Sequence, residues 1–522
     1  MIVDRGLFIA TALAFAALIL NVASVRDVAW VPPDAANLGI VARSLVEGQG
    51  YTENVVPFHP APFASVRHVP EPHGLLQPLL LAPLLALLGE SPAVLRLPAL
   101  AYAALSGVVV FLWGRRLFGT AAGLLACLLT VTNSSLAASG VLGTDDAGFA
   151  FFVVATLAAL DRALDTRSGR DFLLAGVLAA LTLLQKAGGI FMAGILLAVP
   201  LFAPRPRARA LLLLWAPFLA ALGVYFLRNY FAHGSLHFRI APLDWYLRAE
   251  GYEGMMRLFD EPPRLVATLR ALGPARVVEL IGRELGKLVA AVWPGPPWLL
   301  PSPFFALASP AFLVALGLVA VPLLAPWYGG AAALTGLAVL GATVLLTVLW
   351  HVEIRFLGFL IPLSALWLAG LLATAARLAG RGRARRPALI VAGVLALALV
   401  APGAWAFVRA QRTFRTLPDL SPCRAALGWL DANSLPGERI LTFDPWLASW
   451  LIRRDAIMIP SGGGAELATV ARRYDAHWLL IWRMFSRPDT SRALMNLRGR
   501  VDGLVVAKEY DDATCRIHRL VW

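Results

Sequence analysis

The sequence predicts an α-helical membrane protein with many crossings and a small α/β domain at its C-terminal end. Three observations lead to this fold class. Of the 522 residues, 59% are apolar and only 15% are charged, which suits a bilayer better than water. Apolar runs of about 20 residues, each long enough to cross roughly 30 Å of hydrocarbon as a helix, recur as far as Val408. Beyond Val408 the composition becomes that of a soluble domain.

The charge balance supports the same class. A net charge of +14 would suggest nucleic-acid binding in a soluble protein. Here the arginines cluster in short loops between apolar runs, where the positive-inside rule accounts for them. The charge therefore indicates topology and contact with anionic lipids, and argues against a nucleic-acid partner. The first apolar run, 7–25, is followed by Arg26-Asp27 without a small-residue cleavage site, so we expect a retained helix.

The polar segment 26–73 follows the first run and forms the first large loop. Within it Leu38, Val41 and Leu45 recur at helical spacing, which predicts a short amphipathic helix over 34–47 on the membrane surface. A carboxylate on this helix would stand at the mouth of the membrane-embedded part.

The apolar run 74–89 poses a choice between a full crossing and a shorter segment. The next run ends in the basic turn 114–119, which belongs on the cytoplasmic side. If 74–89 crossed the membrane, this turn and every later basic loop would lie outside. We therefore predict that this proline-interrupted run lies at the interface or re-enters without crossing.

The remaining runs complete a set of about eleven crossings, with the N-terminus inside and the C-terminus outside. The transmembrane domain is thus expected over 1–408. A second large outside loop, 228–300, carries an amphipathic helix over 264–292. No internal repeat of the kind found in transporters with two equivalent halves is visible. After the first crossing, the predicted crossings are 94–113, 120–140, 147–163, 172–186, 188–204, 210–227, 304–324, 328–350, 355–376 and 388–408.

The C-terminal region, 409–522, is predicted to be an extracytoplasmic α/β domain of roughly 100 residues. Cys423 and Cys515 both fall in this region, and their spacing leaves open whether they form a disulfide. Cys127 lies in an apolar run and is expected in the core. The expected helices are near 423–431, 466–474 and 492–497, and the expected strands are 439–443, 456–459, 478–481, 504–507 and 515–521.

Two acidic positions are candidates for chemistry, because ionisable groups near a bilayer are costly and usually functional. Asp34 follows two prolines at the start of the predicted surface helix, where an N-cap is the structural alternative to catalysis. Asp145 and Asp146 lie between two predicted crossings, where capping the next helix is again the alternative. Adjacent carboxylates repel unless a cation or a proton relieves them, which points to a metal or a basic substrate group.

Three cations, Lys186, Arg228 and Arg355, form a third candidate. In the predicted topology all three lie at outside ends of crossings, on the same face as the acidic candidates. Each alone is typical of an interfacial residue that extends its charge to water. Together with the acids they suggest a groove that binds phosphate.

Other motifs limit the choice of chemistry. His59, His68 and His73 match no metal-binding spacing and are expected to lie in a solvated loop. The sequence contains neither a Walker loop nor a Rossmann fingerprint after a strand. A membrane transferase without a nucleotide-sugar domain would need a lipid-carried donor that enters from the bilayer.

Several short motifs follow one another along most of the chain, in an order more specific than any one of them. They are Pro33-Asp34 with Ile40 to Tyr51, His73-Gly-Leu-Leu-Gln-Pro78 with Leu79 to Gly89, Ser91 to Arg96, Gly114 to Gly119, Asp145-Asp146, Arg228-Asn-Tyr with Gly234-Ser235, and Glu353-Ile-Arg355-Phe. In this order and topology they resemble the GT-C glycosyltransferase superfamily. The resemblance is greatest to the bacterial branch related to protein O-mannosyltransferases and lipid A aminoarabinose transferases.

The resemblance implies an inverting transfer of a sugar from a polyprenyl-phosphate donor to a lipid, glycan or protein acceptor. It places the active site on the extracytoplasmic side of the bacterial inner membrane. Asp34 matches the first-loop acid that acts as general base or holds the acceptor. Asp145 or Asp146 matches a second acid that in some members assists metal or acceptor binding, which leaves a divalent cation open. The implied substrate-binding residues are Lys186, Arg228 and Arg355 at the polyprenyl phosphate, with Glu353, His73 and Tyr51 from the matching motifs.

Two departures from the family pattern bear on one alternative function, and the placement of polar residues bears on another. Ala35 stands where the family often has Glu after the first Asp, and a Tyr common a few residues later is missing. A structural or assembly subunit with a degenerate site is consistent with this change. A transporter or flippase for polyprenyl lipids would instead place polar residues along a path to both faces, whereas the candidates here gather on one face.

Overall fold

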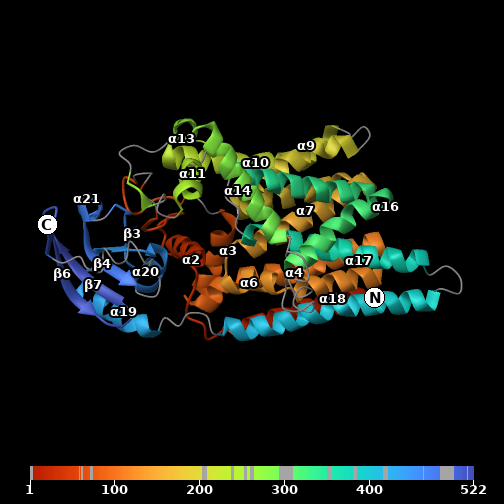
Figure 1. Cartoon of the computed structure of the whole chain (residues 1–522), viewed down its shortest axis with the longest axis horizontal. Helices are drawn as coiled ribbons and strands as arrows, with labels where there is room; N and C mark the ends of the chain where they lie inside the picture. Colours follow the sequence, from red (N-terminus) through yellow and green to blue (C-terminus); the bar gives the residue numbers. More distant parts are fainter. Residues whose placement is uncertain are drawn as a thin grey trace.

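The molecule is elongated, with a bundle of long helices at one end and a sheet at the other (Figure 1). The N-terminal helix begins at the end of the bundle far from the sheet, and the C-terminus lies in the sheet. The computed structural model describes residues 4–57, 59, 63–70, 74–202, 208–234, 236, 240–251, 256–258, 264–292, 310–349, 354–379, 385–415, 421–462, 464–482, 499–513 and 515–522.

Seven helices in the described part of the chain are long and apolar enough to cross a membrane, and a bent pair adds an eighth. The prediction of a multi-pass membrane protein is therefore confirmed. The seven are α1 (Arg5–Val25), α4 (Pro92–Phe118), α7 (Asp146–Thr166), α10 (Ala208–His233), α16 (Pro310–Val344), α17 (Leu360–Ala379) and α18 (Arg385–Phe414). The bent pair is α5 (Thr120–Val131) with α6 (Ser134–Leu142), at an angle of 53°.

Two features explain why fewer long helices are present than the roughly eleven crossings expected from hydropathy. The described parts of the runs predicted over 304–324 and 328–350 fall in α16, which is kinked at Tyr328 (φ −133°, ψ 40°), and in the π-helical turn η3 (Leu345–Leu349) that continues it. In addition, α8 (Gly169–Gln185) has 17 residues and α9 (Met192–Phe202) has 11. Both are short for a span, although α8 packs directly against α7 and α10.

The elements that follow α1 differ in part from the predictions. α3 (Leu76–Leu88) has 13 residues and reaches only about 20 Å, which agrees with a segment that does not cross. α2 (Pro33–Val46) replaces the predicted surface helix, but most of its residues are buried because it packs against α3 and α20 (Pro445–Ile452). The helix therefore has no large exposed face, and its position relative to the membrane surface stays a prediction.

The second large loop also contains short helices. The single helix predicted over 264–292 is divided into α13 (Leu265–Leu272) and α14 (Pro274–Val292). The division falls at Gly273, whose φ of +75° is left-handed and ends α13. α11 (Ile240–Glu250) precedes them.

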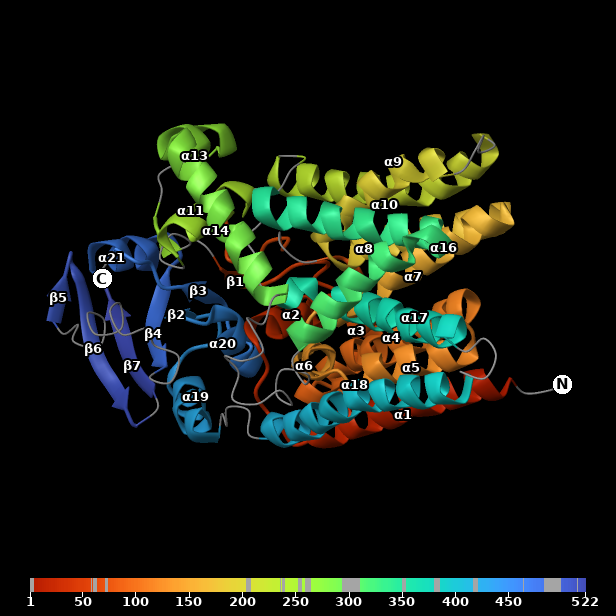
Figure 2. The same ribbon diagram turned by 45° about the vertical axis from the view of Figure 1, so that its right-hand side comes forward.

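The C-terminal region forms a seven-stranded sheet in the order β1-β3-β2-β4-β7-β6-β5. The pairs β1–β3, β3–β2 and β2–β4 are parallel, and the pairs from β4 to β5 are antiparallel (Figure 2). The helices of this region are α19 (Ser421–Asn433), α20 and α21 (Gly464–Arg473). The strands are β1 (Val55–Val56), β2 (Arg439–Thr442), β3 (Ala456–Met458), β4 (Ala476–Trp482), β5 (Gly499–Val501), β6 (Leu504–Asp511) and β7 (Cys515–Val521).

Sequence patterns located most of this sheet but not all of it. β2, β3, β4, β6, β7, α19 and α21 coincide with predicted elements, whereas β1, β5 and α20 were not predicted. The helix expected near 492–497 lies outside the described residues. β1 is the most consequential addition, because it comes from the first loop and pairs with β3 through Val55 and Ala456. The first loop and the C-terminal region therefore share one sheet.

The C-terminal region also shows the state of Cys423 and Cys515, for which the sequence left a disulfide open. Cys423 in α19 and Cys515 in β7 are buried in one hydrophobic cluster with Trp478 and Trp482. Both are thiols in the structure rather than a disulfide. Cys127 is buried among the membrane helices, where the apolar run around it had placed it.

Candidate active site

Asp34 lies in the first turn of α2, where Pro33 provides a backbone dihedral suited to a helix start. Its carboxylate does not cap the helix, because the N-cap residue is Pro32 and no side chain bonds to the first turn. Instead, Asp34 forms an ion pair with Arg355, 321 positions further along the chain. The side chains of Asp34 and Arg355 are 26% and 37% exposed, so the pair remains accessible to a ligand.

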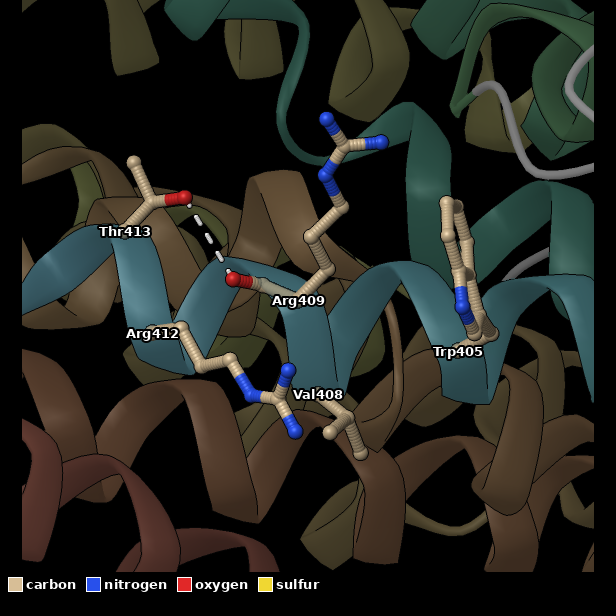
Figure 3. Close-up of a pocket in the computed structure, with 5 residues that line it drawn as sticks. All are labelled: Trp405, Val408, Arg409, Arg412 and Thr413. Carbon is tan, nitrogen blue, oxygen red and sulfur yellow. Dashed lines mark hydrogen bonds between the residues drawn. The ribbon is translucent and has the colours of Figure 1, made fainter.

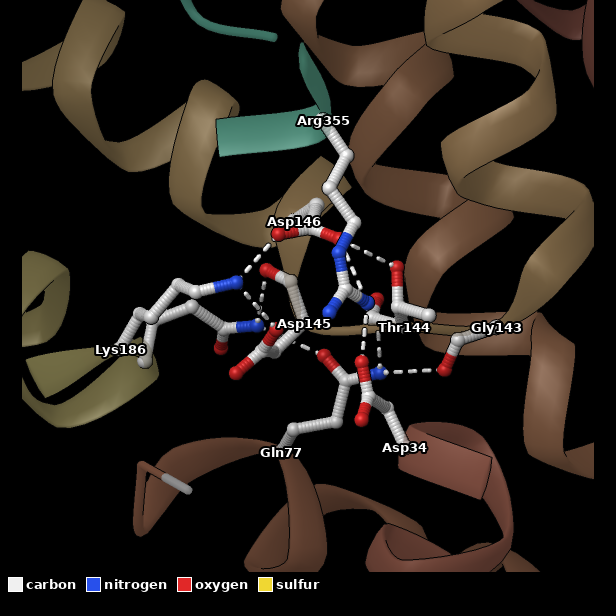
Figure 4. A network of polar contacts seen from close by, with 9 residues as sticks. Asp34, Gln77, Gly143, Thr144, Asp145, Asp146, Lys186 and Arg355 are labelled. Atoms are coloured by element: carbon white, nitrogen blue, oxygen red, sulfur yellow. Dashed lines mark hydrogen bonds and ion pairs between the residues drawn. The ribbon is translucent and has the colours of Figure 1, made fainter. Parts of the chain in front are cut away.

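Asp145 and Asp146 lie at the start of α7 and share Lys186 as their counter-ion (Figure 4). The Lys186 ammonium is 2.9 Å from Asp145 Oδ1 and also contacts Asp146. Both carboxylates are almost fully buried. Neither Asp145 at the N-cap position nor any other side chain caps α7. Lys186 has extended backbone between α8 and the 3-10 helix η1 (Ala187–Phe191), which turns its side chain toward the acids.

Arg355 joins the two acidic positions. Besides its pair with Asp34, its Nη1 atom lies 3.9 Å from Asp146 Oδ2. That oxygen also accepts a 2.9 Å hydrogen bond from the Thr144 hydroxyl. Arg355 belongs to the short 3-10 helix η4 (Ile354–Leu357), and its guanidinium lies 5.2 Å from the ring centre of Phe356. Candidates from α2, α7, the end of α8 and η4 thus meet in one cluster, which we call the acid–cation cluster: Asp34, Asp145, Asp146, Lys186 and Arg355.

Two glutamines that the sequence analysis did not propose as site residues bond to the backbone that leads into Asp145. Gln185 donates to the side-chain oxygen of Gln77 (2.7 Å) and to the backbone carbonyl of Asp145 (3.1 Å). Gln77 in turn donates to the carbonyls of Gly143 (3.2 Å) and Thr144 (3.4 Å). Both glutamines are fully buried. A polar amide within an apolar run is the signal that could have identified them.

The remaining predicted substrate residues lie at the edge of the cluster or outside the described part. Arg228, near the end of α10, bonds to Asn229 Oδ1 (2.9 Å) and stacks on Tyr225. Tyr51 donates to the carbonyl of Gly74 (3.0 Å). Burial raises the pKa of Tyr51, and the charges of Arg228 and Asp145 act on it in opposite directions. Tyr51 therefore lies within electrostatic reach of both. His73 and Glu353 are not among the described residues.

The histidines of the first loop are not solvated as expected. His59 is 1% exposed and contacts the carbonyl of Met458, and burial lowers its pKa to about 4. His68 stacks on Phe63 with ring centres 3.7 Å apart. His59 is buried and the side chain of His68 is only 10% exposed, because the first loop folds onto the C-terminal sheet instead of standing in water. The expectation of a solvated loop is therefore wrong for His59 and His68.

A metal fits poorly between the paired acids. Within the described ranges no group of three or more His, Cys, Asp or Glu side chains could hold a metal ion. Asp145 and Asp146 already direct their carboxylates at the Lys186 ammonium. The repulsion that suggested a metal is thus relieved by a side chain of the protein itself.

One further carboxylate of the C-terminal region lies at the start of α20, the helix that packs on α2. Asp444 is the N-cap of α20 and accepts a 3.0 Å hydrogen bond from the Leu447 backbone N–H. Burial raises the pKa of Asp444 to about 6, and the charge of Asp34 contributes to the shift. An Asp-Pro pair after a strand signals a helix cap in sequence, but its closeness to Asp34 is visible only in the fold.

Two cavities lie elsewhere on the helical bundle. One of about 630 Å³ lies between the α4–α5 junction, α17 and α18. In the other, Arg409 and Arg412 point to opposite sides of α18, so they do not converge on one ligand (Figure 3). Neither cavity contains a residue of the acid–cation cluster. The second cavity has a volume of about 540 Å³ and is lined by Trp405, Val408, Arg409, Arg412 and Thr413.

The family model described as dolichyl-phosphate-mannose-protein mannosyltransferase matches residues 72–228. A comparison with curated proteins finds no match. The fold is similar to ArnT from Cupriavidus metallidurans bound to undecaprenyl phosphate, with a TM-score of 0.60, 13% identity and 97% of each chain covered. It is also similar to the archaeal oligosaccharyltransferase AglB from Archaeoglobus fulgidus in complex with an inhibitory peptide and a dolichol-phosphate. That similarity has a TM-score of 0.58 at 14% identity and covers 92% of this chain and 69% of AglB. The resemblance to the GT-C superfamily is confirmed as a likeness of fold.

Proposed function

We propose that this chain, which has the fold of the GT-C glycosyltransferases, transfers a sugar from a polyprenyl-phosphate donor to an acceptor hydroxyl. The observation that carries the proposal is the meeting of Asp34, Lys186 and Arg355 in one cluster beside the C-terminal sheet. A carboxylate can take a proton from a hydroxyl, and cations can stabilise a leaving phosphate. The cluster therefore contains both groups that such a transfer needs.

The phosphate of the donor is assigned to the cations. Arg355 is the most accessible of the cluster, since its side chain is 37% exposed against 18% for Lys186. Arg228 adds a third positive charge at the edge, within electrostatic reach of Tyr51. The structures of ArnT and AglB hold undecaprenyl phosphate and dolichol-phosphate, and the same class of ligand suits a bundle of apolar helices that a polyprenyl tail can enter from the bilayer.

Binding of the donor would also release the base. Asp34 is paired with Arg355, so the guanidinium occupies the carboxylate oxygen that would have to contact the acceptor hydroxyl. A phosphate brings negative charge that competes for Arg355, and the partial exposure of the pair keeps the cost of exchange low. The donor thus prepares Asp34 for the acceptor, which favours ordered binding.

The transfer then proceeds in one displacement. Asp34 accepts the proton of the acceptor hydroxyl, whose oxygen attacks the anomeric carbon from the side opposite the phosphate. The bond between that carbon and the phosphate oxygen breaks, and its electron pair leaves with the phosphate. Arg355 and Lys186 stabilise the charge on the leaving group. The configuration at the anomeric carbon is inverted.

Asp145 and Asp146 are assigned a positioning role. They fix Lys186 from two sides, and Asp146 also lies 3.9 Å from Arg355. Removing either acid would leave the buried ammonium with less compensation. Their task in this proposal is to hold the cations at the phosphate.

The proposed location is the extracytoplasmic side of the bacterial inner membrane. In support, α2, which carries Asp34, lies at the end of the bundle beside the sheet (Figure 1). Arg115, in the last turn of α4, pairs with Asp4 at the start of α1, which is the end of the bundle far from the sheet. Basic residues at one end of the spans indicate the cytoplasmic side. The acceptor would then be a lipid, glycan or protein of the cell envelope.

The test is sugar transfer or release from a panel of radiolabelled polyprenyl-phosphate sugars by wild type and Asp34→Asn. Turnover by wild type that falls roughly 100- to 10,000-fold in the variant would support both the activity and the base. Activity that survives would move the base to Asp145 or Asp146. Absence of turnover with every donor, together with lipid scrambling in vesicles, would support a transporter instead.

A further inference from the structure

Asp444 is a carboxylate near the site that the proposed transfer does not use. Arg43, near the end of α2, donates to the carbonyl of Trp450, near the end of α20, at 2.9 Å. The C-terminal ends of the two helices therefore lie together. Their N-terminal ends carry Asp34 and Asp444. These ends are close as well, because Asn37, one turn after Asp34, and Trp446, two residues after Asp444, bond to the same carboxylate oxygen.

Buried Glu53 fixes this arrangement of the two helices. Its Oε2 atom accepts hydrogen bonds from Asn37 of α2 (2.8 Å) and from the indole N–H of Trp446 of α20 (3.2 Å). Its other oxygen lies 3.2 Å from His68 Nε2. Glu53 is fully buried and precedes β1, so the first loop locks α2 to the C-terminal region at the level of the two aspartates.

The cap of α20 does not explain why residue 444 is an aspartate. Asparagine caps a helix about as well, and it would bring no negative charge toward Asp34. Two carboxylates within electrostatic reach disfavour each other's ionised form. A ligand that donates a hydrogen bond to each of them would offset that cost.

We propose that Asp34 and Asp444 face the same acceptor, so that Asp444 accepts a hydrogen bond from a group beside the reactive hydroxyl and turns that hydroxyl toward Asp34. This inference rests on the proposed function and narrows its substrate class. The acceptor presents a second donor next to its nucleophile, either a neighbouring hydroxyl of a sugar or an amine. Trp446, two residues along α20, is held by Glu53 and packs against the hydrophobic cluster that joins α20 to α2, which keeps Asp444 in place beside α2.

The first experiment compares wild type, Asp444→Asn and the control Glu509→Gln, which changes an exposed carboxylate of β6. The donor is a radiolabelled polyprenyl-phosphate sugar. The surrogate acceptors are butyl glycosides that carry a hydroxyl, an amino group or only hydrogen beside one hydroxyl. Wild type and the control should prefer the first two over the deoxy compound by about tenfold in kcat/KM, the value of one charged hydrogen bond. Asp444→Asn should lose this preference while its KM for the donor stays within about twofold.

The outcomes separate the inference from the proposed function. Turnover with an unchanged preference in Asp444→Asn would overturn the inference and leave the glycosyltransferase intact. A preference for the amino compound would identify an amine, and equal use of both would identify a neighbouring hydroxyl. Because asparagine keeps the cap, a thermal melt of Asp444→Asn should match that of Glu509→Gln at neutral pH or lie above it.

If wild type turns over no donor, the proposed function fails, and binding decides the inference. Infrared difference spectra would then follow the carboxyl band that Asp444→Asn removes. The butyl glycoside with a neighbouring hydroxyl should shift this band in wild type, and Asp34→Asn should shift it without any glycoside. A band that responds to neither would overturn the inference independently of turnover.

Discussion

α7 carries a buried aspartate near each of its ends, and the two are held in different ways. Beside the sheet, Asp146 is bound by Lys186 from the end of α8 and lies 3.9 Å from Arg355 of η4. At the opposite end, Asp161 accepts a 2.8 Å hydrogen bond from the indole N–H of Trp113 in α4. It also forms an ion pair with Arg116 of the same helix. The residue type, burial and kind of partner are alike at both ends.

The difference lies in what each end leaves exposed. The group around Asp161 joins two adjacent helices and satisfies the buried carboxylate, whose side chain is 6% exposed. The acid–cation cluster draws on four elements and continues into the Asp34–Arg355 pair, which remains partly open. Buried ion pairs in a membrane bundle are therefore weak indicators of function by themselves. An accessible ion pair between distant segments, beside a buried one, is the more informative feature.

The strongest test of this contrast replaces one aspartate at each end of the bundle, Asp34 or Asp161, by asparagine. Asp34→Asn should lower transfer roughly 100- to 10,000-fold because the base is lost, whereas Asp161→Asn should leave the activity per folded molecule within about threefold. The measurement is kcat/KM on the same donor, normalised to the folded fraction from size-exclusion chromatography. Comparable losses in the two variants would mean that the ends are not functionally distinct.

Removal of the carboxylate at the far end should instead reduce stability. Asp161→Ala leaves Arg116 and the Trp113 indole without their buried acceptor, which should cost about 3 kcal/mol. Asp165→Ala is the matched control, since its carboxylate is 68% exposed and lies 3.5 Å from the same arginine. Thermal unfolding in detergent should show a clear drop for Asp161→Ala and almost none for Asp165→Ala. Equal melting temperatures for these two variants would contradict a structural role for Asp161.

Arg355→Ala sharpens the comparison at the site end. Loss of the guanidinium should raise KM for the polyprenyl-phosphate donor about tenfold, with a smaller change for the acceptor, because the phosphate loses a charged partner. Arg377→Ala, at the opposite end of the bundle, serves as the control. Its guanidinium donates to the Tyr328 hydroxyl at 2.9 Å, so KM for the donor should not change. Equal losses for donor and acceptor in Arg355→Ala would count against the phosphate assignment.

The two ends also differ in how far sequence could predict them. Apolar runs locate spans because each crossing must satisfy its own backbone, and the acids and cations of the cluster were selected because charge at span ends is costly. The sequence could not show that Arg355 reaches Asp34, since only the packed fold brings such distant segments together. The sequence shows Gln77 and Gln185 as amides within apolar runs. It does not show that they bond to each other, because that depends on the close approach of α3 to α8.

The first loop shows a second reason why prediction stops. β1 has two residues, too few for any alternation of apolar and polar side chains to appear. It becomes a strand because β3 offers an open edge next to it. Asp444 likewise has the sequence pattern of a helix cap, and the fold gives it a second neighbour, Asp34, that the pattern does not contain. Local rules therefore predicted the elements of the C-terminal region, and tertiary contacts added the part that faces the site.

The smallest expected effect is the loss of stability that comes from burying the Asp444 carboxylate near Asp34. Burial, with the charge of Asp34, raises the pKa of Asp444 from 3.8 to about 6 in the folded protein. The folded state then binds a proton more tightly than the unfolded chain, so this contribution to stability is complete below about pH 4 and is lost as the pH rises through about 6. Asp444→Asn does not titrate, and its melting temperature should fall less than that of wild type across this window. The measurement is thermal unfolding from pH 4 to pH 7 in one detergent, with Glu509→Gln as control.

Curves for wild type and Asp444→Asn that run parallel across the window would show that Asp444 meets no unfavourable environment and would separate it from Asp34. Burial alone would keep the curves of wild type and Asp444→Asn apart after Asp34→Asn is added to both. A divergence that becomes smaller in that background would have the opposite meaning, because only a neighbouring charge makes the two positions depend on each other. In that case the end of the bundle beside the sheet gives up stability to keep carboxylates near one another, whereas the Asp161 end gains stability from a carboxylate that is fully paired. A cost that persists beside the proposed base and the cations proposed to bind phosphate is what a binding site is expected to show.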